Sequence, residues 1–165
     1  MSSADMFIYD EEFQQINAII SLLLDDANAK VVFLVDKNGQ QIAGDGELDN
    51  LDTTSLASLT AGNVAATDGL AQLLGEKEFS VLFHEGERDN IHISIISRRV
   101  ILVVIFDEHS SLGLVRLRVK KAAKDLEHVF SVIMQKVETE RMQSSAEVES
   151  PFAEITDDDI DRLFS

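Results

Sequence analysis

Apolar residues recur at helical spacing near both ends of the chain. Between about residues 9 and 28 they return every three or four positions, behind three acidic residues that suit a helix N-terminus. A stretch from about residue 111 to residue 137 repeats in the same way, although its first part, LVRLRV, also alternates like a strand. The pattern predicts a helix at each end of a core domain, residues 9–137.

Five short segments rich in β-branched residues predict strands. The first, VVFLVD, is followed by an Asn-Gly turn that tolerates positive φ, so a return strand is expected directly after it. The last three are joined by links too short for crossover helices, and VILVVIF has no polar position, so it should be a central strand covered on both faces. The expected strands are residues 31–36, 40–43, 78–83, 91–97 and 100–106.

The segment between the second and third strands, residues 53–75, contains one charged side chain, Asp68. It has a helix start signal at Asp52 and a stop signal at Gly75. Five leucines gather on one side of such a helix: Leu56, Leu59, Leu70, Leu73 and Leu74. A strip of small residues runs beside them: Gly62, Ala65, Ala66 and Gly69. We expect this helix to meet a partner, since a surface helix normally carries charges outward; the alternative is a core helix of a monomer.

These elements give the order α-β-β-α-β-β-β-α, an α/β fold of the α+β type with a five-stranded antiparallel sheet. The composition changes after residue 137, and residues 138–149 read as a flexible polar linker. Residues 150–165 combine acidic charge with apolar side chains at Phe152, Ile155, Ile160, Leu163 and Phe164. Thr156 can cap a short helix there, so we expect an acidic amphipathic segment that docks on a partner. The alternative is a disordered solubilising end.

Charge and composition limit the function classes. A formal net charge of −16 disfavours nucleic acid as a partner, because phosphate binding needs clustered Lys and Arg. A basic run at residues 116–124 is most simply a solvated face, or it could receive the acidic C-terminal segment. The chain has no Cys, no signal-like apolar run and no stretch long enough to span a membrane, which predicts a cytoplasmic protein.

Catalytic and metal-binding motifs are absent from the sequence. No P-loop string occurs, and Asp157, Asp159 and Asp161 resemble a calcium loop only until Arg162, which stands where the turn needs Gly. The four His residues lack metal spacing and are expected at the surface or at strand ends. The sequence therefore predicts no metal, no cofactor and no catalytic residue, which is the pattern of a binding protein rather than an enzyme.

Several long strings resemble the Roadblock family, and in particular its MglB branch of bacterial cell-polarity regulators. They are NAKVVFLVDKNGQ, LDTTSLASLTAGNVAA, LFHEG, SLGLVRLRVKKA and the terminal SPFAEITDDDID. The resemblance covers the chain from about residue 9, while residues 1–8 show no correspondence and are expected to be a flexible N-terminus. It implies a three-layer α-β-α sandwich, a homodimer whose sheet continues between subunits, and pairing of the second helix with its mate.

The resemblance also implies a function. MglB-like proteins activate GTP hydrolysis by a Ras-like small GTPase of the MglA type in polarity and motility, and a cell pole is one place where they act. By position, Gly62, Ala65, Ala66 and Gly69 would lie at the dimer and GTPase contact, and residues 150–165 would add a contact that affects nucleotide exchange. Activation could come from selection of a hydrolysis-competent GTPase conformation, or from Arg98 or Arg99 as an arginine finger. The alternative function is a Roadblock-type scaffold without activating function.

Overall fold

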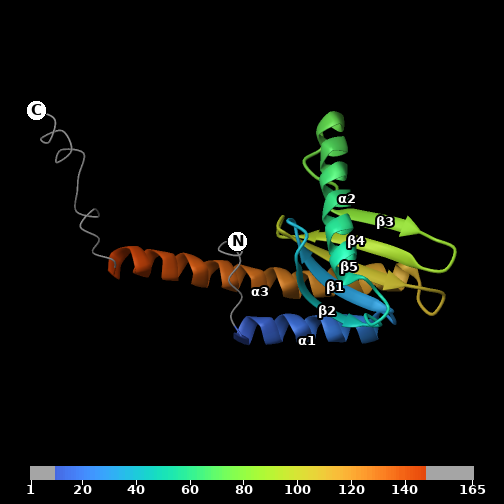
Figure 1. Ribbon diagram of the computed structural model, residues 1–165, viewed down its shortest axis with the longest axis horizontal. Helices are drawn as coiled ribbons and strands as arrows, with labels where there is room; N and C mark the ends of the chain where they lie inside the picture. The colour runs from blue at the N-terminus through green and yellow to red at the C-terminus, as the bar shows by residue number, and fades with distance from the viewer. Residues whose placement is uncertain (1–9, 148–165) are drawn as a thin grey trace, which may run out of the picture. The chain divides into compact units, whose positions relative to one another are not determined.

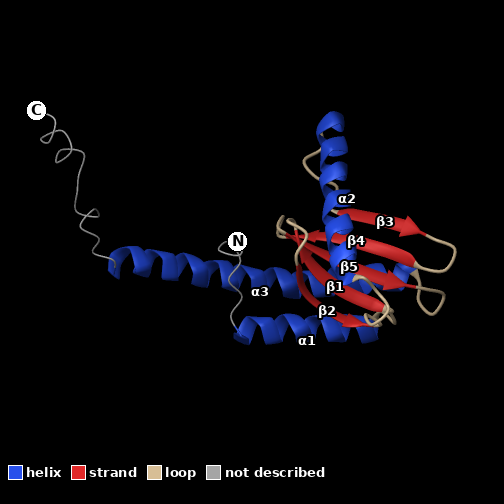
Figure 2. Cartoon of the chain, viewed as in Figure 1, coloured by secondary structure: helices blue, strands red, loops and turns tan. Residues whose placement is uncertain are grey.

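The structure, a computed structural model, describes residues 10–147 of the 165-residue chain (Figures 1 and 2). Its elements follow the expected order α-β-β-α-β-β-β-α. They are α1 (Asp10–Asp26), β1 (Val31–Asp36), β2 (Gln41–Gly46), α2 (Thr53–Leu74), β3 (Val81–Glu85), β4 (Asn90–Ile96), β5 (Val100–Phe106) and α3 (Leu112–Glu147). The sheet belongs to the compact unit that ends at Phe130, and the rest of α3 belongs to a second unit.

All five strands form one antiparallel sheet in the order β2-β1-β5-β4-β3. The central position of β5 confirms the prediction made from its unbroken apolar sequence. Every residue of β5 is buried, and Val103 pairs with Phe33 on one side and with Ile93 on the other. Because β5 contacts a strand along each edge and a helix layer on each face, no position in it is available to a polar side chain.

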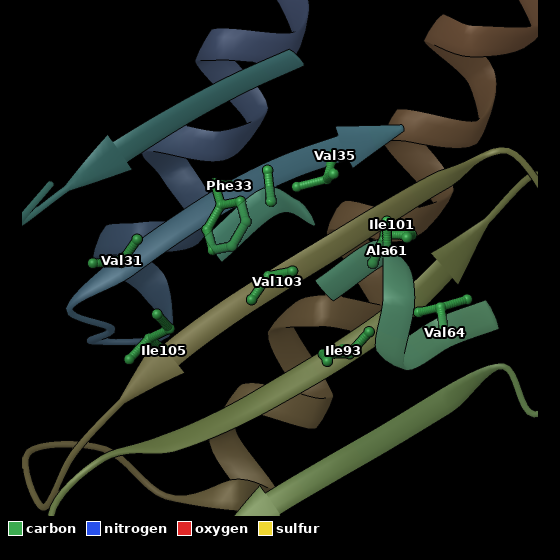
Figure 3. Close-up of a cluster of buried hydrophobic side chains, with 10 residues drawn as sticks. Val31, Phe33, Val35, Ala61, Val64, Ile93, Ile101, Val103 and Ile105 are labelled. Atoms are coloured by element: carbon green, nitrogen blue, oxygen red, sulfur yellow. The ribbon is translucent and has the colours of Figure 1, made fainter. Parts of the chain in front are cut away.

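The sheet has a helix layer on each face, which confirms the three-layer sandwich (Figure 1). In β1, β4 and β5, odd-numbered positions such as Phe33 and Val103 pack against α2 (Figure 3). Even-numbered positions such as Leu34 and Val104 are buried on the opposite face, where α1 and α3 lie. The alternation follows from the two-residue period of a strand. The buried cluster beneath α2 comprises Val31, Phe33, Val35, Ala57, Ala61, Val64, Ile93, Ile101, Val103 and Ile105.

Three elements differ clearly from their expected bounds. Strand β3 spans Val81–Glu85, where residues 78–83 had been expected. Strand β2 continues to Gly46, beyond the expected end at residue 43, because its pairing with β1 resumes after an irregularity at Leu34/Val35. Helix α3 continues to Glu147, so residues 138–147 are helical, whereas residues 138–149 had been predicted to be a flexible polar linker. The reason is that this stretch is built mainly from good helix formers such as Glu, Gln, Met and Arg and contains neither Gly nor Pro.

His92 corrects the expectation that all four His residues lie at the surface or at strand ends. It is 2% exposed in the middle of β4, on the face opposite α2, and its Nδ1 lies 3.4 Å from the Ser94 Oγ. Burial lowers the pKa of His92, and the positive charge of Arg116 lowers it further. The neutral imidazole is therefore favoured at neutral pH. The alternation of His92 and Ser94 with apolar neighbours was a sequence signal for this buried pair.

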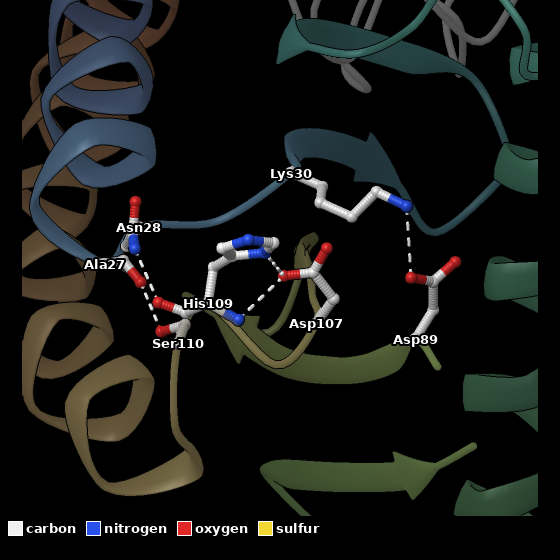
Figure 4. A network of polar contacts seen from close by, with 7 residues as sticks. All are labelled: Ala27, Asn28, Lys30, Asp89, Asp107, His109 and Ser110. Carbon is white, nitrogen blue, oxygen red and sulfur yellow. Dashed lines mark hydrogen bonds and ion pairs between the residues drawn. The ribbon is translucent and has the colours of Figure 1, made fainter. Parts of the chain in front are cut away.

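Polar contacts join the corner between α1 and β1 to the corner between β5 and α3 (Figure 4). The Asn28 side-chain amide donates to the His109 carbonyl, and the Ser110 hydroxyl donates to the Ala27 carbonyl. The ring Nδ1 of His109 lies 2.9 Å from the Asp107 carboxylate, which raises the pKa of His109. The pKa of Asp107 is lowered in turn, mainly by the hydrogen bond from the backbone N–H of His109 and secondly by the one from its ring. Asn28 adopts a φ of 52°, a left-handed conformation that Asn tolerates.

Lys30 and Asp89 add a longer link between the start of β1 and the β3–β4 turn. Their Nζ and carboxylate oxygen are 3.1 Å apart, and this hydrogen bond raises the pKa of Lys30 (Figure 4). Both side chains are substantially exposed, so the pair contributes little to stability. Among the described helices, none combines the length and the apolar character that crossing a membrane requires.

Candidate functional site

Helix α2 is closed at both ends by its own capping residues. The Asp52 carboxylate accepts hydrogen bonds from the hydroxyl (2.7 Å) and the backbone N–H (3.1 Å) of Ser55, which lower the pKa of Asp52. At the other end Gly75 has a φ of 75°, and the N–H of Glu76 donates to the carbonyl of Ala71 at 2.8 Å. This is the pattern of a Schellman cap. The sequence therefore encodes both ends of the helix locally, as its start and stop signals had predicted.

The inner face of α2 consists of small side chains that let the helix lie close to the sheet. Five residues on this face are buried: Ala57, Thr60, Ala61, Val64 and Ala71. The β1–β2 turn also packs closely, because a Cβ added at Gly39 would lie 3.3 Å from the Ser58 Cα. Gly39 has a φ of 89°, so its position requires glycine for its conformation as well as for space. The inner face is thus explained by contacts within the chain.

The outer face of α2 is apolar and uncovered in the single chain. Four leucines on it are between 58% and 84% exposed: Leu59, Leu70, Leu73 and Leu74. The fifth leucine of the predicted group, Leu56, is half-buried and packs against the core beneath the helix. The predicted strip of small residues, Gly62, Ala65, Ala66 and Gly69, is also exposed and lies beside the leucines on the helical wheel. The structure therefore brings the predicted small strip and four of the five leucines onto one surface.

Two glycines of this surface are not required by the fold of the chain. A Cβ added at Gly62 or at Gly69 would meet nothing within 4 Å, and neither residue has a positive φ. Glycine inside a helix costs about 1 kcal/mol relative to alanine, because it loses more conformational freedom on folding. The single chain therefore carries this cost without a packing contact that accounts for it.

Strand β3 lies beside α2 and forms one edge of the sheet. The Asn63 amide nitrogen of α2 lies 2.9 Å from the His84 Nε2 of β3, which links the helix to the edge strand. Val81 of β3 is substantially exposed, whereas Phe83 stacks on Phe106 with ring centroids 6.2 Å apart. An edge strand presents backbone N–H and C=O groups that can pair with another strand. We call the outer face of α2 together with the β3 edge the α2–β3 surface.

A charged cavity of about 390 Å³ lies at the C-terminal half of α2. Its lining residues come from α2, from the segment that follows it and from two hairpin turns: Lys37, Asp68, Gln72, Lys77, Glu78 and Arg98. Asp36 pairs with Val100, which places the β1–β2 and β4–β5 turns at the same end of the sheet. Only Asp68 and Arg98 of this group stand out in the sequence. The rest depended on the strand order, which no local pattern reveals.

The chemistry of the site is that of a contact surface. Within residues 10–147, His, Asp and Glu side chains do not gather into a group able to hold a metal ion. The predicted docking residues Phe152, Ile155, Ile160, Leu163 and Phe164 lie outside the described residues, as does the N-terminal segment 1–8. An exposed apolar patch rimmed by polar residues marks an interaction site more often than a reaction centre. The α2–β3 surface is therefore the candidate functional site.

The chain is similar to one protein family and to several solved structures. Residues 15–106 match the family model of the Roadblock/LC7 domain. The chain is 59% identical to Myxococcus xanthus MglB, with a TM-score of 0.74 over 78% of this chain and 96% of that one. It is 32% identical to the gliding protein MglB of Thermus thermophilus, with a TM-score of 0.70 over 74% of this chain and 93% of that one.

A further solved structure, described as MglB with tetrameric arrangement, is 31% identical and has a TM-score of 0.72 over 76% of this chain and 95% of that one. A Roadblock/LC7 domain from Streptomyces avermitilis shares the fold alone, at 13% identity. No curated protein matches the chain.

Proposed function

The chain belongs to the Roadblock/LC7 domain family, and on that premise we propose that it acts as a homodimer that stimulates GTP hydrolysis by a Ras-like small GTPase of the MglA type. The observation that carries the proposal is the α2–β3 surface, with its exposed leucines and two helical glycines in open space. The similarity to MglB proteins supports the identity of the partner. In this proposal the chain serves bacterial cell polarity and motility, and it acts in the cytoplasm or at a cell pole.

The α2–β3 surface suits a dimer contact for two physical reasons. Full burial of a leucine side chain contributes about 1.5–3 kcal/mol, so burial of the four exposed leucines against a second subunit contributes a large part of the free energy of association. The residues Gly62, Ala65, Ala66 and Gly69 have short or absent side chains, which allows a second helix backbone to approach closely. The edge of β3 offers backbone groups that can continue the sheet into the partner subunit. The tetrameric arrangement described for one MglB relative supports self-association.

The dimer stimulates hydrolysis by binding one conformation of the GTPase more tightly than others. A ligand shifts a conformational equilibrium only through such a difference in affinity. The favoured conformation is the one in which the GTPase's own catalytic groups face the γ-phosphate. The chain itself is then a regulator and supplies no catalytic residue. The C-terminal segment 150–165 adds a second contact through Phe152, Ile155, Ile160, Leu163 and Phe164, and this contact affects nucleotide exchange.

Phosphate release by the cognate GTPase, followed with and without this chain, tests the proposal. We expect a higher rate with the chain present, and we expect the increase to be lost in a Gly62→Arg variant that remains folded but monomeric. The second candidate function, a Roadblock-type scaffold, predicts that a complex forms while the rate stays unchanged. The exposed α2–β3 surface is compatible with either function, so the rate decides between them.

The arginine-finger alternative is tested separately with the double variant Arg98→Ala and Arg99→Ala. Conformational selection predicts that saturating amounts of this variant still stimulate hydrolysis. A variant that binds the GTPase as tightly as the original chain but no longer stimulates it would establish an arginine finger instead. Deleting residues 150–165 tests the C-terminal contact: we expect an intact dimer with weaker GTPase binding or altered exchange. Loss of the dimer in that deletion would contradict an independent docking segment.

A further inference from the structure

The β4–β5 turn holds two side-chain-bearing residues in a conformation that disfavours them. Ser97 and Arg98 have φ values of 52° and 61°, and the N–H of Arg99 donates to the carbonyl of Ile96 at 3.2 Å. This is a type I′ turn, whose central positions are normally taken by Asn and Gly. A left-handed conformation costs roughly 1–2 kcal/mol for a residue with a Cβ. The turn therefore retains Arg98 despite its conformational cost, and such local strain is a reason to look for a function.

Arg98 lines the charged cavity at the C-terminal half of α2. Within that cavity the Lys37 Nζ lies 3.9 Å from the Glu78 Oε1, and the charges of these two side chains partly neutralise each other. Among residues 10–147, Asp68, Lys77 and Arg98 take part in no ion pair. The cavity thus carries one more positive than negative charge, although the whole chain has a formal net charge of −16. Its local charge fits an anionic group better than a cationic one.

The cavity adjoins the small strip of the α2–β3 surface. Asp68 and Gln72, which line the cavity, follow the exposed Ala65 and Gly69 by three positions, a spacing that makes side chains neighbours on a helix. An apolar centre with a polar rim is the usual anatomy of a protein interface, and Arg is enriched among the residues that dominate binding energy. A guanidinium can also bind a carboxylate through two parallel hydrogen bonds, which fixes orientation as well as position.

We propose that Arg98 anchors the GTPase by binding a carboxylate side chain that enters this cavity. The inference rests on the proposed function, because it names a contact within the same complex. The Asp or Glu side chain of the GTPase pairs with the Arg98 guanidinium, with Lys77 at the rim, while the leucines of α2 cover the apolar part of the contact. Arg98 then determines affinity and register. It is not an arginine finger, since its partner is a protein carboxylate rather than the γ-phosphate.

Titration of the cognate GTPase with full-length Arg98→Ala tests the anchor. We expect its dissociation constant to rise about 10- to 100-fold, as is usual when one partner of a desolvated charge pair is removed. At saturation, the rate of phosphate release should match that of the original chain. Arg98→Lys should recover only part of the affinity, because an ammonium cannot form the paired hydrogen bonds of a guanidinium. Arg88→Ala, in the exposed β3–β4 turn at the other end of the sheet, is the matched control and should bind normally.

Arg98→Gly separates binding from turn strain. Glycine relieves the left-handed conformation, so this variant should unfold at a higher temperature than Arg98→Ala. It should lose the same affinity, since both variants lack the guanidinium. Double-mutant cycles between Arg98→Ala and single Asp→Ala or Glu→Ala variants of the GTPase should find one carboxylate whose loss is strongly coupled to that of Arg98.

Three results would overturn the anchor while leaving the proposed function in place. They are an unchanged dissociation constant for Arg98→Ala, normal binding with a lost rate at saturation, and cycles in which no carboxylate is coupled to Arg98. An original chain that neither binds nor stimulates the GTPase is a different failure. It would contradict the proposed function itself, and the anchor with it.

Discussion

The two faces of α2 use similar residues for different reasons. The inner face is small because the sheet and the β1–β2 turn lie against it, and Ala57, Ala61 and Val64 there pack in the buried cluster beneath α2. The outer face is equally small at Gly62 and Gly69, yet the chain places nothing near either residue. A small residue with a contact is accounted for by the fold. A small residue in open space, beside exposed leucines, indicates a contact that only another molecule can supply.

The largest contrast is expected from introducing the same charged side chain on each face. Ala61→Arg would force a guanidinium into the buried cluster beneath α2, which should destabilise the fold by more than about 4 kcal/mol. Gly62→Arg, one position along, points into open space and should leave the fold intact while preventing self-association. Circular dichroism and light scattering measure the two effects. An Ala61→Arg chain that folds normally, or a Gly62→Arg chain that remains a dimer, would contradict the assignment of the faces.

Truncating large apolar side chains should separate the two surfaces at a smaller scale. Val103 lies in the centre of the sheet beneath α2, and Val103→Ala should lower the free energy of unfolding by about 1–3 kcal/mol through lost burial and a residual cavity. Leu73 is 84% exposed, so Leu73→Ala should change the stability of a monomeric Gly62→Arg background by less than about 0.5 kcal/mol. In the dimeric chain the same Leu73→Ala should weaken association. Urea unfolding and dilution experiments distinguish these outcomes.

The two faces differ in how far local sequence determines them. The caps of α2, the leucines and the small strip were readable because each depends on spacing within one segment. The inward turn of Leu56 was not, since it depends on which strands and helices become neighbours. The cavity at Arg98 is the clearest case: the β1–β2 and β4–β5 turns meet only because β1 pairs with β5. The continuation of α3 through residues 138–147 is different, because helix propensity alone could have predicted it.

Glycine substitution tests whether the outer face is held open for another backbone. Gly69→Ala should stabilise α2 by up to about 1 kcal/mol in a monomeric Gly62→Arg background, because alanine is the better helix former. In the otherwise unchanged chain it should weaken the dimer if a partner helix lies against this position. Dissociation on dilution, measured by light scattering, gives the second effect. A Gly69→Ala chain with an equally tight dimer would show that the subunits do not approach each other at Gly69.

The smallest expected effects concern how stability depends on pH at the buried His92 and at the exposed His109. Burial lowers the pKa of His92, so its contribution to stability is complete above the ordinary histidine pKa and is lost as pH falls through the lower folded value. Asp107 raises the pKa of the exposed His109, so His109 contributes to stability in the opposite pH range. Its contribution is complete below the ordinary histidine pKa and is lost as pH rises through the raised folded value. His92→Gln should therefore reduce the loss of stability on acidification, and Asp107→Asn should lower the pKa of His109. NMR titration of both rings measures these shifts, and a His92 ring that titrates above His109 would contradict the burial of His92 and the pairing of His109 with Asp107.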